Sequence, residues 1–225
     1  LFPQNNSKEN LLVVGNSQSV DFYNVLSFST KITSHFNIAR FGTNINNIDD
    51  EFFASPNYIS ADTIVLCSLM GKSDLDNLER VAKAIINDGK HLFICENIFT
   101  WMERSTYTKL DHLIVNGLHN KILPITLSEQ INAQYTHDFT NRKFATIKRR
   151  EIFLQMKKVL DYLNSQIDFT VLDRMNYVCS EGVCSVVSDR LGKYFFDMGH
   201  HTMLGAKYFG SVIDTNGFAS RIVGE

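Results

Sequence analysis

The sequence predicts an α/β fold, a three-layer α/β/α sandwich in which helices cover both faces of a central parallel sheet. Short apolar runs alternate with helical patterns along the chain, and such alternation is typical of parallel sheets. The segment 74–95 shows this most clearly, because a helical pattern ends near Gly89 and an apolar run follows. The apolar side of that helix is formed by Leu78, Val81, Ala82 and Ile85.

The remaining elements follow from local pattern. Short apolar runs bounded by glycine or polar residues predict strands at 11–15, 36–41, 63–69, 91–95 and 168–172. Helical spacing predicts helices at 18–29, 74–88, 146–165 and 202–214. The segment 97–145 is rich in aromatic and polar residues, so we expect irregular loops or short helices there, with Trp101 as a packing residue. We expect 175–188 to form a peripheral hairpin.

Length and composition indicate one domain. The chain has 225 residues and 44% apolar content, enough for one substantial core, and we expect a polar linker at 1–10 followed by a domain at 11–225. Because the chain opens on Leu1, an excised domain or processed product is expected. No apolar run approaches the roughly 20 residues that span a bilayer.

Charge argues against a nucleic-acid partner. The formal net charge is -2, from 22 basic and 24 acidic residues, so no electropositive surface is indicated. The short basic cluster 148–150 is expected to be a solvated helix face or a contact for an anionic glycan or lipid headgroup.

Two segments at opposite ends of the chain together indicate a Ser-His-Asp hydrolytic triad. Ser17 follows an apolar run and Gly15, where a strand passes into a helix, and a helix N-terminus supplies N–H donors for a negative oxygen. A serine hydroxyl needs a base, which His200 can provide, and Asp197 can hold the other ring nitrogen through a tight turn. This chemistry requires no metal or other cofactor.

Each segment also has a structural interpretation. A Gly-x-Ser sequence at a strand end is often only a turn in which serine caps the next helix. The segment 197–200 can be a surface turn that leads into a helix capped by Thr202. The two segments in this order favour catalysis more than either does alone.

The same residues carry a family resemblance. "VVGNSQS" and "FFDMGHHTMLGA" resemble the first and last motif blocks of the SGNH hydrolase superfamily, in which G-D-S carries the nucleophile and D-x-x-H the acid and base. "YFFDMGHHTMLGAKYFG" is similar to the ending of SGNH domains attached to family-three membrane acyltransferases, with Phe195 at a tyrosine position. "MNYVCSEGVCSVV" is similar to a C-x4-C segment of that branch.

The resemblance implies an SGNH or flavodoxin-like fold and a function. That function is O-acetylation of a bacterial surface polysaccharide through an acyl-Ser17 intermediate, with an acyl donor and a polysaccharide acceptor as partners. It also implies a membrane acyltransferase domain upstream and an extracytoplasmic location, in the periplasm or at the cell surface, tethered to the inner membrane. The resemblance favours a disulfide between Cys179 and Cys184 over reduced thiols, and a zinc site is poorly matched. Cys67 and Cys95 lie in apolar strands and are expected to be inert packing residues.

Several positions depart from the family pattern. Asn16 replaces the motif acid and Gln18 its histidine; Asn16 keeps its hydrogen-bonding capacity but loses the charge. His201 stands at a leucine position and competes with His200 for the role of base, although the D-x-x-H spacing favours His200.

The oxyanion donors are expected from three positions. Gly42 is assigned to the superfamily's second block and the segment 71–74 to its third block, with Ser73 in place of asparagine. With Ser17, Gly42 and Ser73 then form the expected oxyanion set.

Two other functions remain open. A stand-alone carbohydrate esterase or lipase-like hydrolase would use the same triad with water as acceptor. A non-catalytic glycan-binding module on a degenerate SGNH scaffold would be consistent with Asn16 and Gln18.

Overall fold

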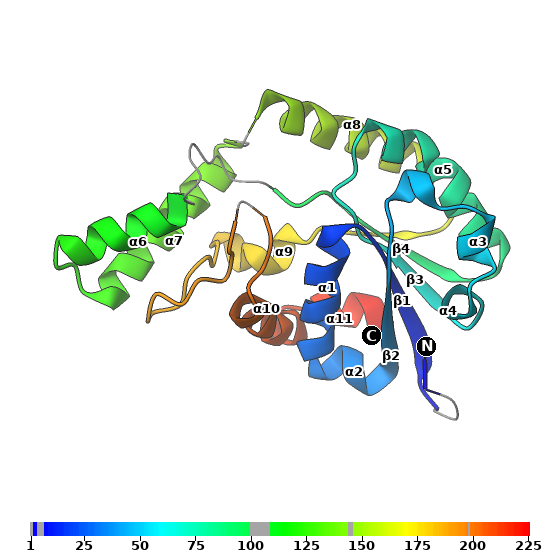
Figure 1. Cartoon of the computed structure of the whole chain (residues 1–225), viewed down its shortest axis with the longest axis horizontal. Helices are drawn as coiled ribbons and strands as arrows, with labels where there is room; N and C mark the ends of the chain where they lie inside the picture. Colours follow the sequence, from blue (N-terminus) through cyan, green and yellow to red (C-terminus); the bar gives the residue numbers. More distant parts are fainter. Residues whose placement is uncertain (1, 4–6, 100–108, 144–145, 198) are drawn as a thin grey trace.

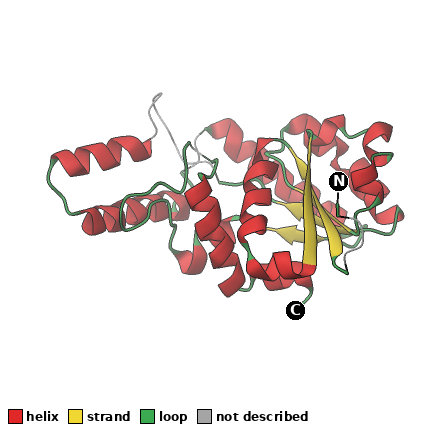
Figure 2. Ribbon diagram, turned by 60° about the horizontal axis from the view of Figure 1, so that its bottom comes forward, coloured by secondary structure: helices red, strands yellow, loops and turns green. Residues whose placement is uncertain are grey.

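The computed structural model describes residues 2–3, 7–99, 109–143, 146–197 and 199–225. Its centre is a five-stranded sheet of order β2-β1-β3-β4-β5, in which every neighbouring pair is parallel (Figures 1 and 2). The strands are β1 (Glu9–Gly15), β2 (Phe36–Gly42), β3 (Thr63–Leu66), β4 (His91–Cys95) and β5 (Thr170–Leu172). The predicted three-layer fold class is confirmed.

Helices cover both faces of the sheet (Figure 1). One face is covered by α1 (Ser17–Phe28), α2 (Thr30–His35), α9 (Met175–Val178), α10 (Met203–Thr215) and α11 (Phe218–Val223). The other is covered by α3 (Asp50–Phe53), α4 (Pro56–Ile59), α5 (Lys72–Asn87) and α8 (Ile147–Asn164), with the 3-10 turn η1 (Ile45–Asn47) beside them. The predicted helices at 18–29, 74–88, 146–165 and 202–214 all exist, with ends that differ by one or two residues.

Strand β1 supplies side chains to both layers of the core. Successive strand residues point to opposite faces, so Leu11 and Val13 pack beneath α1 and α10, and Leu12 and Val14 pack beneath α5 and α8. All four are fully buried, as expected for a central strand of a parallel sheet. This burial sets the position of Gly15 and of the helix that follows it.

The prediction for 97–145 was wrong in part. Its described residues include a long helical hairpin, α6 (Lys109–His119) and α7 (Pro124–Thr140), that projects from the sandwich (Figure 1). Leu127, Ile131 and Tyr135 recur every four residues and form the buried stripe of α7, which the surrounding polar residues hide in the sequence. Trp101 lies outside the described residues.

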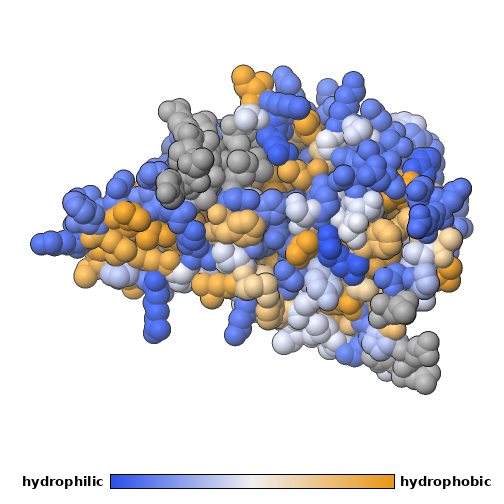
Figure 3. Space-filling view, viewed as in Figure 1, coloured by the Kyte–Doolittle hydropathy of each residue, from blue (hydrophilic) through white to orange (hydrophobic). Residues whose placement is uncertain are grey.

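The projecting hairpin also exposes apolar side chains. Figure 3 shows them gathered on its surface, and they include Val115, Leu118, Leu123 and Ile125. The two helices pack closely, because a Cβ at Gly117 would lie 2.4 Å from Leu127 Cδ1.

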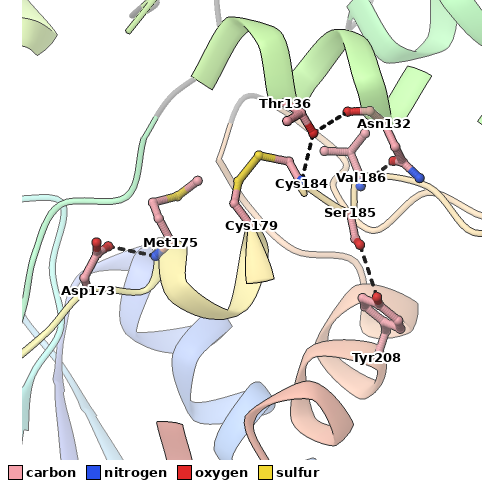
Figure 4. Close-up of a disulfide and its surroundings, with 9 residues drawn as sticks. All are labelled: Asn132, Thr136, Asp173, Met175, Cys179, Cys184, Ser185, Val186 and Tyr208. Atoms are coloured by element: carbon pink, nitrogen blue, oxygen red, sulfur yellow. Dashed lines mark hydrogen bonds between the residues drawn. A yellow bond between two sulfur atoms is a disulfide. The ribbon is translucent and has the colours of Figure 1, made fainter. Parts of the chain in front are cut away.

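The predicted hairpin at 175–188 is also wrong. The helical turn α9 leads into a 3-10 turn, η2 (Ser180–Gly182), where Glu181 has a φ of 53°. The structure contains the expected disulfide between Cys179 and Cys184 across this turn (Figure 4). Cys184 N–H donates to Thr136 Oγ1 at 2.8 Å, so the disulfide loop is bound to α7 rather than paired as a β-ribbon.

Several strand ends differ from expectation. β1 begins at Glu9, inside the expected linker 1–10, and β2 ends one residue later than expected, at Gly42. β3 ends at Leu66 instead of 69, and β5 begins at Thr170 instead of 168. None of the helices in the described parts of the chain combines the length and the hydropathy that a membrane span requires.

Candidate functional site

The turn after β1 places Ser17 at the start of a helix. Gly15 has a φ of +155°, and a Cβ there would lie 2.1 Å from the carbonyl oxygen of Cys67, so only glycine fits. Ser17 is the first residue of α1 and is exposed at the carboxyl edge of the sheet. The N–H groups of a helix's first turn have no partner within the helix, so this position offers donors to a ligand.

Asn16 holds this turn in place. Its Oδ1 accepts from Gln18 N–H at 3.2 Å and from Leu69 N–H at 3.1 Å, and its Nδ2 donates to the Leu69 carbonyl at 3.2 Å. The backbone N–H of Asn16 donates to Ser68 Oγ at 3.0 Å. An aspartate has no N–H group and could not donate the hydrogen bond to the Leu69 carbonyl oxygen. Asparagine at this position therefore adds a hydrogen bond to the turn that the motif acid could not make.

The structure brings Ser17, His200 and Asp197 together. His200 Nε2 lies 2.9 Å from Ser17 Oγ, across 183 positions of sequence. His200 Nδ1 lies 2.7 Å from Asp197 Oδ2. Because a neutral imidazole donates from one nitrogen and accepts at the other, a proton on Nδ1 bonded to Asp197 leaves Nε2 free to accept from the serine hydroxyl.

The Asp197 carboxylate is held by its own loop. Its Oδ1 accepts from the backbone N–H groups of Gly199 at 2.9 Å and His200 at 2.7 Å. Burial alone would raise the pKa of Asp197, but these N–H groups and the His200 ring hold that pKa below its usual value. The acid is therefore ionised at neutral pH. Phe196 stacks on the His200 ring, with centroids 5.5 Å apart.

His201 lies in the core and not beside Ser17. It is 6% exposed and packs against Phe195, Phe209 and Tyr177. Burial holds the pKa of His201 well below its usual value. Of the two histidines, only His200 is hydrogen-bonded to Ser17 in the part of the chain that the structure describes.

The two other positions expected as oxyanion donors are placed differently. Gly42 ends β2 in register with Gly15, so it lies at the same edge of the sheet as Ser17. Ser73 lies in the first turn of α5, on the wall of a cavity of about 800 Å³, and no hydrogen bond to Ser17 or His200 is found among the described residues.

Part of the basic cluster 148–150 lines the same cavity. It is lined by residues from the starts of α5 and α8: Gly71, Lys72, Ser73, Asp76, Thr146, Lys148, Arg149, Glu151, Ile152 and Gln155. Charged side chains of both signs face it, and no ion pair among them is found in the described residues.

From the sequence, Gln18 was identified only as a departure from the family motif, and Asp21 and Arg174 were not identified. Gln18 is 1% exposed, its Nε2 lies 3.4 Å from the Gly199 carbonyl, and its Oε1 accepts from Arg174 Nη1 at 3.0 Å. Asp21 Oδ1 accepts from His201 N–H at 3.3 Å. Helical spacing places Asp21 one turn after Ser17, which was a usable signal, whereas nothing local marks Arg174.

The two remaining cysteines are buried, as predicted. Cys67 and Cys95 are 0% exposed and lie next to each other at the ends of β3 and β4. The described residues contain no group of three or more His, Cys, Asp or Glu side chains arranged to hold a metal ion.

Comparisons with known proteins reveal likeness in structure. No protein-family model matches the sequence, and the comparison with curated proteins found no match. The periplasmic domain of a lipopolysaccharide acetyltransferase from Salmonella ser. Paratyphi A superposes with a TM-score of 0.60 at 14% identity, over 97% of this chain and 85% of that domain.

Two further structures are less similar. A GDSL-like lipase from Bacteroides thetaiotaomicron VPI-5482 has a TM-score of 0.47 at 10% identity, over 95% of this chain and 89% of the lipase. The acetyl xylan esterase AlAXEase has a TM-score of 0.45 at 11% identity, over 91% of this chain and 97% of the esterase. The likeness to the Salmonella domain shows a shared fold: the chain has the three-layer α/β/α architecture that the sequence predicted.

Proposed function

We propose that this protein is a serine-dependent acyl-transfer enzyme that O-acetylates a bacterial surface polysaccharide, with Ser17, His200 and Asp197 as its catalytic triad. The observation that carries the proposal is a continuous pair of hydrogen bonds: Ser17 Oγ lies 2.9 Å from His200 Nε2, and His200 Nδ1 lies 2.7 Å from Asp197 Oδ2. The shared fold with a lipopolysaccharide acetyltransferase domain supports the reaction class, and the motif resemblance supports the acceptor class.

Acyl transfer would proceed in two steps. Ser17 Oγ attacks the carbonyl carbon of the acyl donor while its proton passes to His200 Nε2, and that proton is then transferred to the donor's leaving group. A hydroxyl of the acceptor next gives its proton to His200 and attacks the acyl-serine, which forms the new ester and returns the proton to Ser17. Asp197 stabilises the protonated ring throughout.

The negative oxygen of each intermediate requires fixed donors. We propose the N–H groups of Ser17 and Gly42, because Ser17 begins α1 and Gly42 ends the neighbouring strand at the same edge. Ser73 is our candidate for the third donor on motif grounds alone.

The cavity between α5 and α8 is our candidate for the acceptor's path. Leu69 is bonded to Asn16, and Gly71, two positions further on, already lines the cavity. The cavity is lined by carboxylate, ammonium and guanidinium groups that are not paired with one another in the described residues. Such groups suit the many hydrogen-bond donors and acceptors of a glycan. In this proposal Lys148 and Arg149 contact the acceptor.

We further propose an extracytoplasmic location, supported by the disulfide between Cys179 and Cys184, because disulfides persist in oxidising compartments. The upstream membrane acyltransferase domain is proposed from the motif resemblance. In the full-length protein it would deliver the acyl group to Ser17.

The direct test is hydrolysis of p-nitrophenyl acetate by the wild type and by Ser17→Ala, His200→Asn and Asp197→Asn. We expect Ser17→Ala and His200→Asn to fall to the background rate, and Asp197→Asn to lose several orders of magnitude in kcat. Ser27→Ala is the matched control and should keep full activity, because Ser27 is an exposed serine on the same helix whose hydroxyl, among the described residues, donates only to Tyr23 O. Equal rates in wild type and Ser17→Ala would favour the non-catalytic glycan-binding module.

A second assay separates transfer from hydrolysis. The chain is incubated with an acetyl donor and with O-deacetylated surface polysaccharide, and the products are resolved by mass spectrometry. Acetylated glycan supports the transferase, whereas free acetate at the same rate with and without glycan indicates an esterase. Lys148→Ala should raise KM for the glycan relative to Arg150→Ala, a neighbouring cation that does not line the cavity.

A further inference from the structure

We propose that Gln18 is a positioning residue that holds the loop of Asp197 and His200 against the helix of Ser17, and that the buried Arg174 orients Gln18 for this task. The inference rests on the proposed function of the triad. It concerns a residue at the position where the resembling branch carries histidine, so it assigns a role to a departure from the family pattern.

Helix α1 holds three consecutive residues of the loop. Ser17 Oγ bonds to the ring of His200, Gln18 Nε2 donates to the Gly199 carbonyl at 3.4 Å, and Asp21 Oδ1 accepts from the His201 N–H at 3.3 Å. Residues 18 and 21 of a helix lie on neighbouring rows of its surface. The backbone on both sides of His200 is therefore anchored to the helix that carries Ser17.

Arg174 determines which way the Gln18 amide points. Arg174 is fully buried two residues after the end of β5, and its Nη1 donates to Gln18 Oε1 at 3.0 Å and to the Gln18 carbonyl oxygen at 3.4 Å. A guanidinium has only donors, so it must face the amide oxygen, and the amide NH₂ is turned toward Gly199. Nine-tenths and more of Gln18 and Arg174 are buried, so water does not compete for these bonds.

The arrangement has an energetic cost that a purely structural role does not explain. Within the described residues, no carboxylate lies within ion-pair distance of Arg174, although a buried cation is normally paired. Among the residues described, the one side-chain acceptor of this cation is Gln18, the neighbour of Ser17. Buried ionisable groups in strongly perturbed environments cluster at functional sites.

The decisive variant is Gln18→Glu, with Gln166→Glu as control. A carboxylate at 18 still accepts from Arg174 and adds a charge attraction, so folding should be preserved or improved, but it has no N–H for the Gly199 carbonyl. Gln166 is exposed, and within the described part of the chain its side chain is hydrogen-bonded only to Ser165, so the same chemical change there should alter nothing. Gln18→His provides one donor nitrogen and one acceptor nitrogen and should retain more activity than Gln18→Glu.

Three readouts are taken for each variant: the urea unfolding midpoint, kcat and KM for p-nitrophenyl acetate across pH, and the low-field proton NMR signal of His200 Nδ1–H. We expect Gln18→Glu to keep the urea midpoint and to lose or broaden the NMR signal of His200. We expect kcat to fall about 10-fold or more at every pH, because displacement of a catalytic group by about 1 Å costs on the order of 100-fold in rate.

Other outcomes would overturn the inference. They are wild-type kcat and an unchanged NMR signal in Gln18→Glu, or a loss of kcat that is fully recovered at a shifted pH, which would indicate a charge effect. The NMR signal does not depend on turnover. If the wild type shows no Ser17-dependent activity but Gln18→Glu alone loses the signal, the proposed function has failed and the positioning role stands.

Discussion

Asp21 is buried without a full set of partners, and its replacement by asparagine tests the electrostatics beneath the site. The side chain is 5% exposed, its Oδ1 accepts from His201 N–H, and its Oδ2 has no hydrogen-bond partner among the described residues. Burial raises the pKa of Asp21 from 3.8 to about 6, although His200 and Arg174 oppose the shift. Asp21→Asn keeps the shape and the Oδ1 acceptor and removes the ionisation.

The sign and size of the effect follow from linkage. Between the pKa of the unfolded chain and that of the folded protein, folding takes up a proton, so the free energy of unfolding falls as pH rises. The two values, 3.8 and about 6, correspond to about 3 kcal/mol in total, with one pH unit worth about 1.4 kcal/mol. About 1 kcal/mol of that is already present at pH 4.5, so about 2 kcal/mol should appear between pH 4.5 and 7.5.

The assay is urea unfolding of both proteins at a series of pH values. The free energy of unfolding of Asp21→Asn minus that of the wild type should increase by about 2 kcal/mol from pH 4.5 to 7.5, and constant effects of the substitution cancel in this difference. A difference that does not change with pH, or one that decreases, would refute the reasoning about burial at this position.

Three further perturbations test the fold. Gly15→Ala should lower the free energy of unfolding by more than about 3 kcal/mol, because the new Cβ would overlap a backbone carbonyl. Gly89→Ala should cost about 1–2 kcal/mol, because Gly89 has a φ of +73° but open space around it. Equal urea midpoints for the two variants would contradict this. Replacing Cys179 and Cys184 by serine should cost about 2 kcal/mol in urea unfolding and leave esterase turnover intact, and lost turnover in folded protein would contradict it. Asp214→Asn should lower the free energy of unfolding by about 1–2 kcal/mol at pH 7 and by less near pH 3. Hydrogen bonds from residues 29–31 outweigh burial and lower the pKa of Asp214, so the stability that its carboxylate contributes is lost as pH falls. A cost that does not change with pH would count against this.

The parts of the fold that sequence predicted are those specified by local pattern. The apolar run 11–14, the glycine after it and the capping asparagine are adjacent in the chain, so the strand, the turn and the helix of Ser17 could all be located. The three-residue spacing of Asp197 and His200 likewise allowed their hydrogen bond to be predicted, since one tight turn contains both. Ser17 and His200 were paired from the chemical needs of a serine nucleophile and from the family resemblance, because no local pattern joins positions 183 apart.

The errors arose where long-range packing decides. Polar residues separate the buried apolar residues of α7 in the sequence. Their burial depends on packing against α6 and the disulfide loop, and no local pattern predicts that packing. The loop containing Cys179 was predicted as a hairpin because strands were expected on both sides, but Glu181 and Gly182 take left-handed backbone angles and form a 3-10 turn. Arg174 has no helical or strand spacing relative to Gln18, so their contact could not be predicted.

The most direct test of the central claim is the intact mass of the protein after brief incubation with p-nitrophenyl acetate and acid quenching, followed by peptide mapping. The proposed mechanism predicts an added acetyl group on the peptide that contains Ser17, present in the wild type and in Ser27→Ala and absent from Ser17→Ala. It also predicts that the adduct disappears as fresh acceptor glycan is supplied. No adduct on Ser17 in a wild type that turns over the ester, or an equal adduct in Ser17→Ala, would contradict the assignment of the nucleophile.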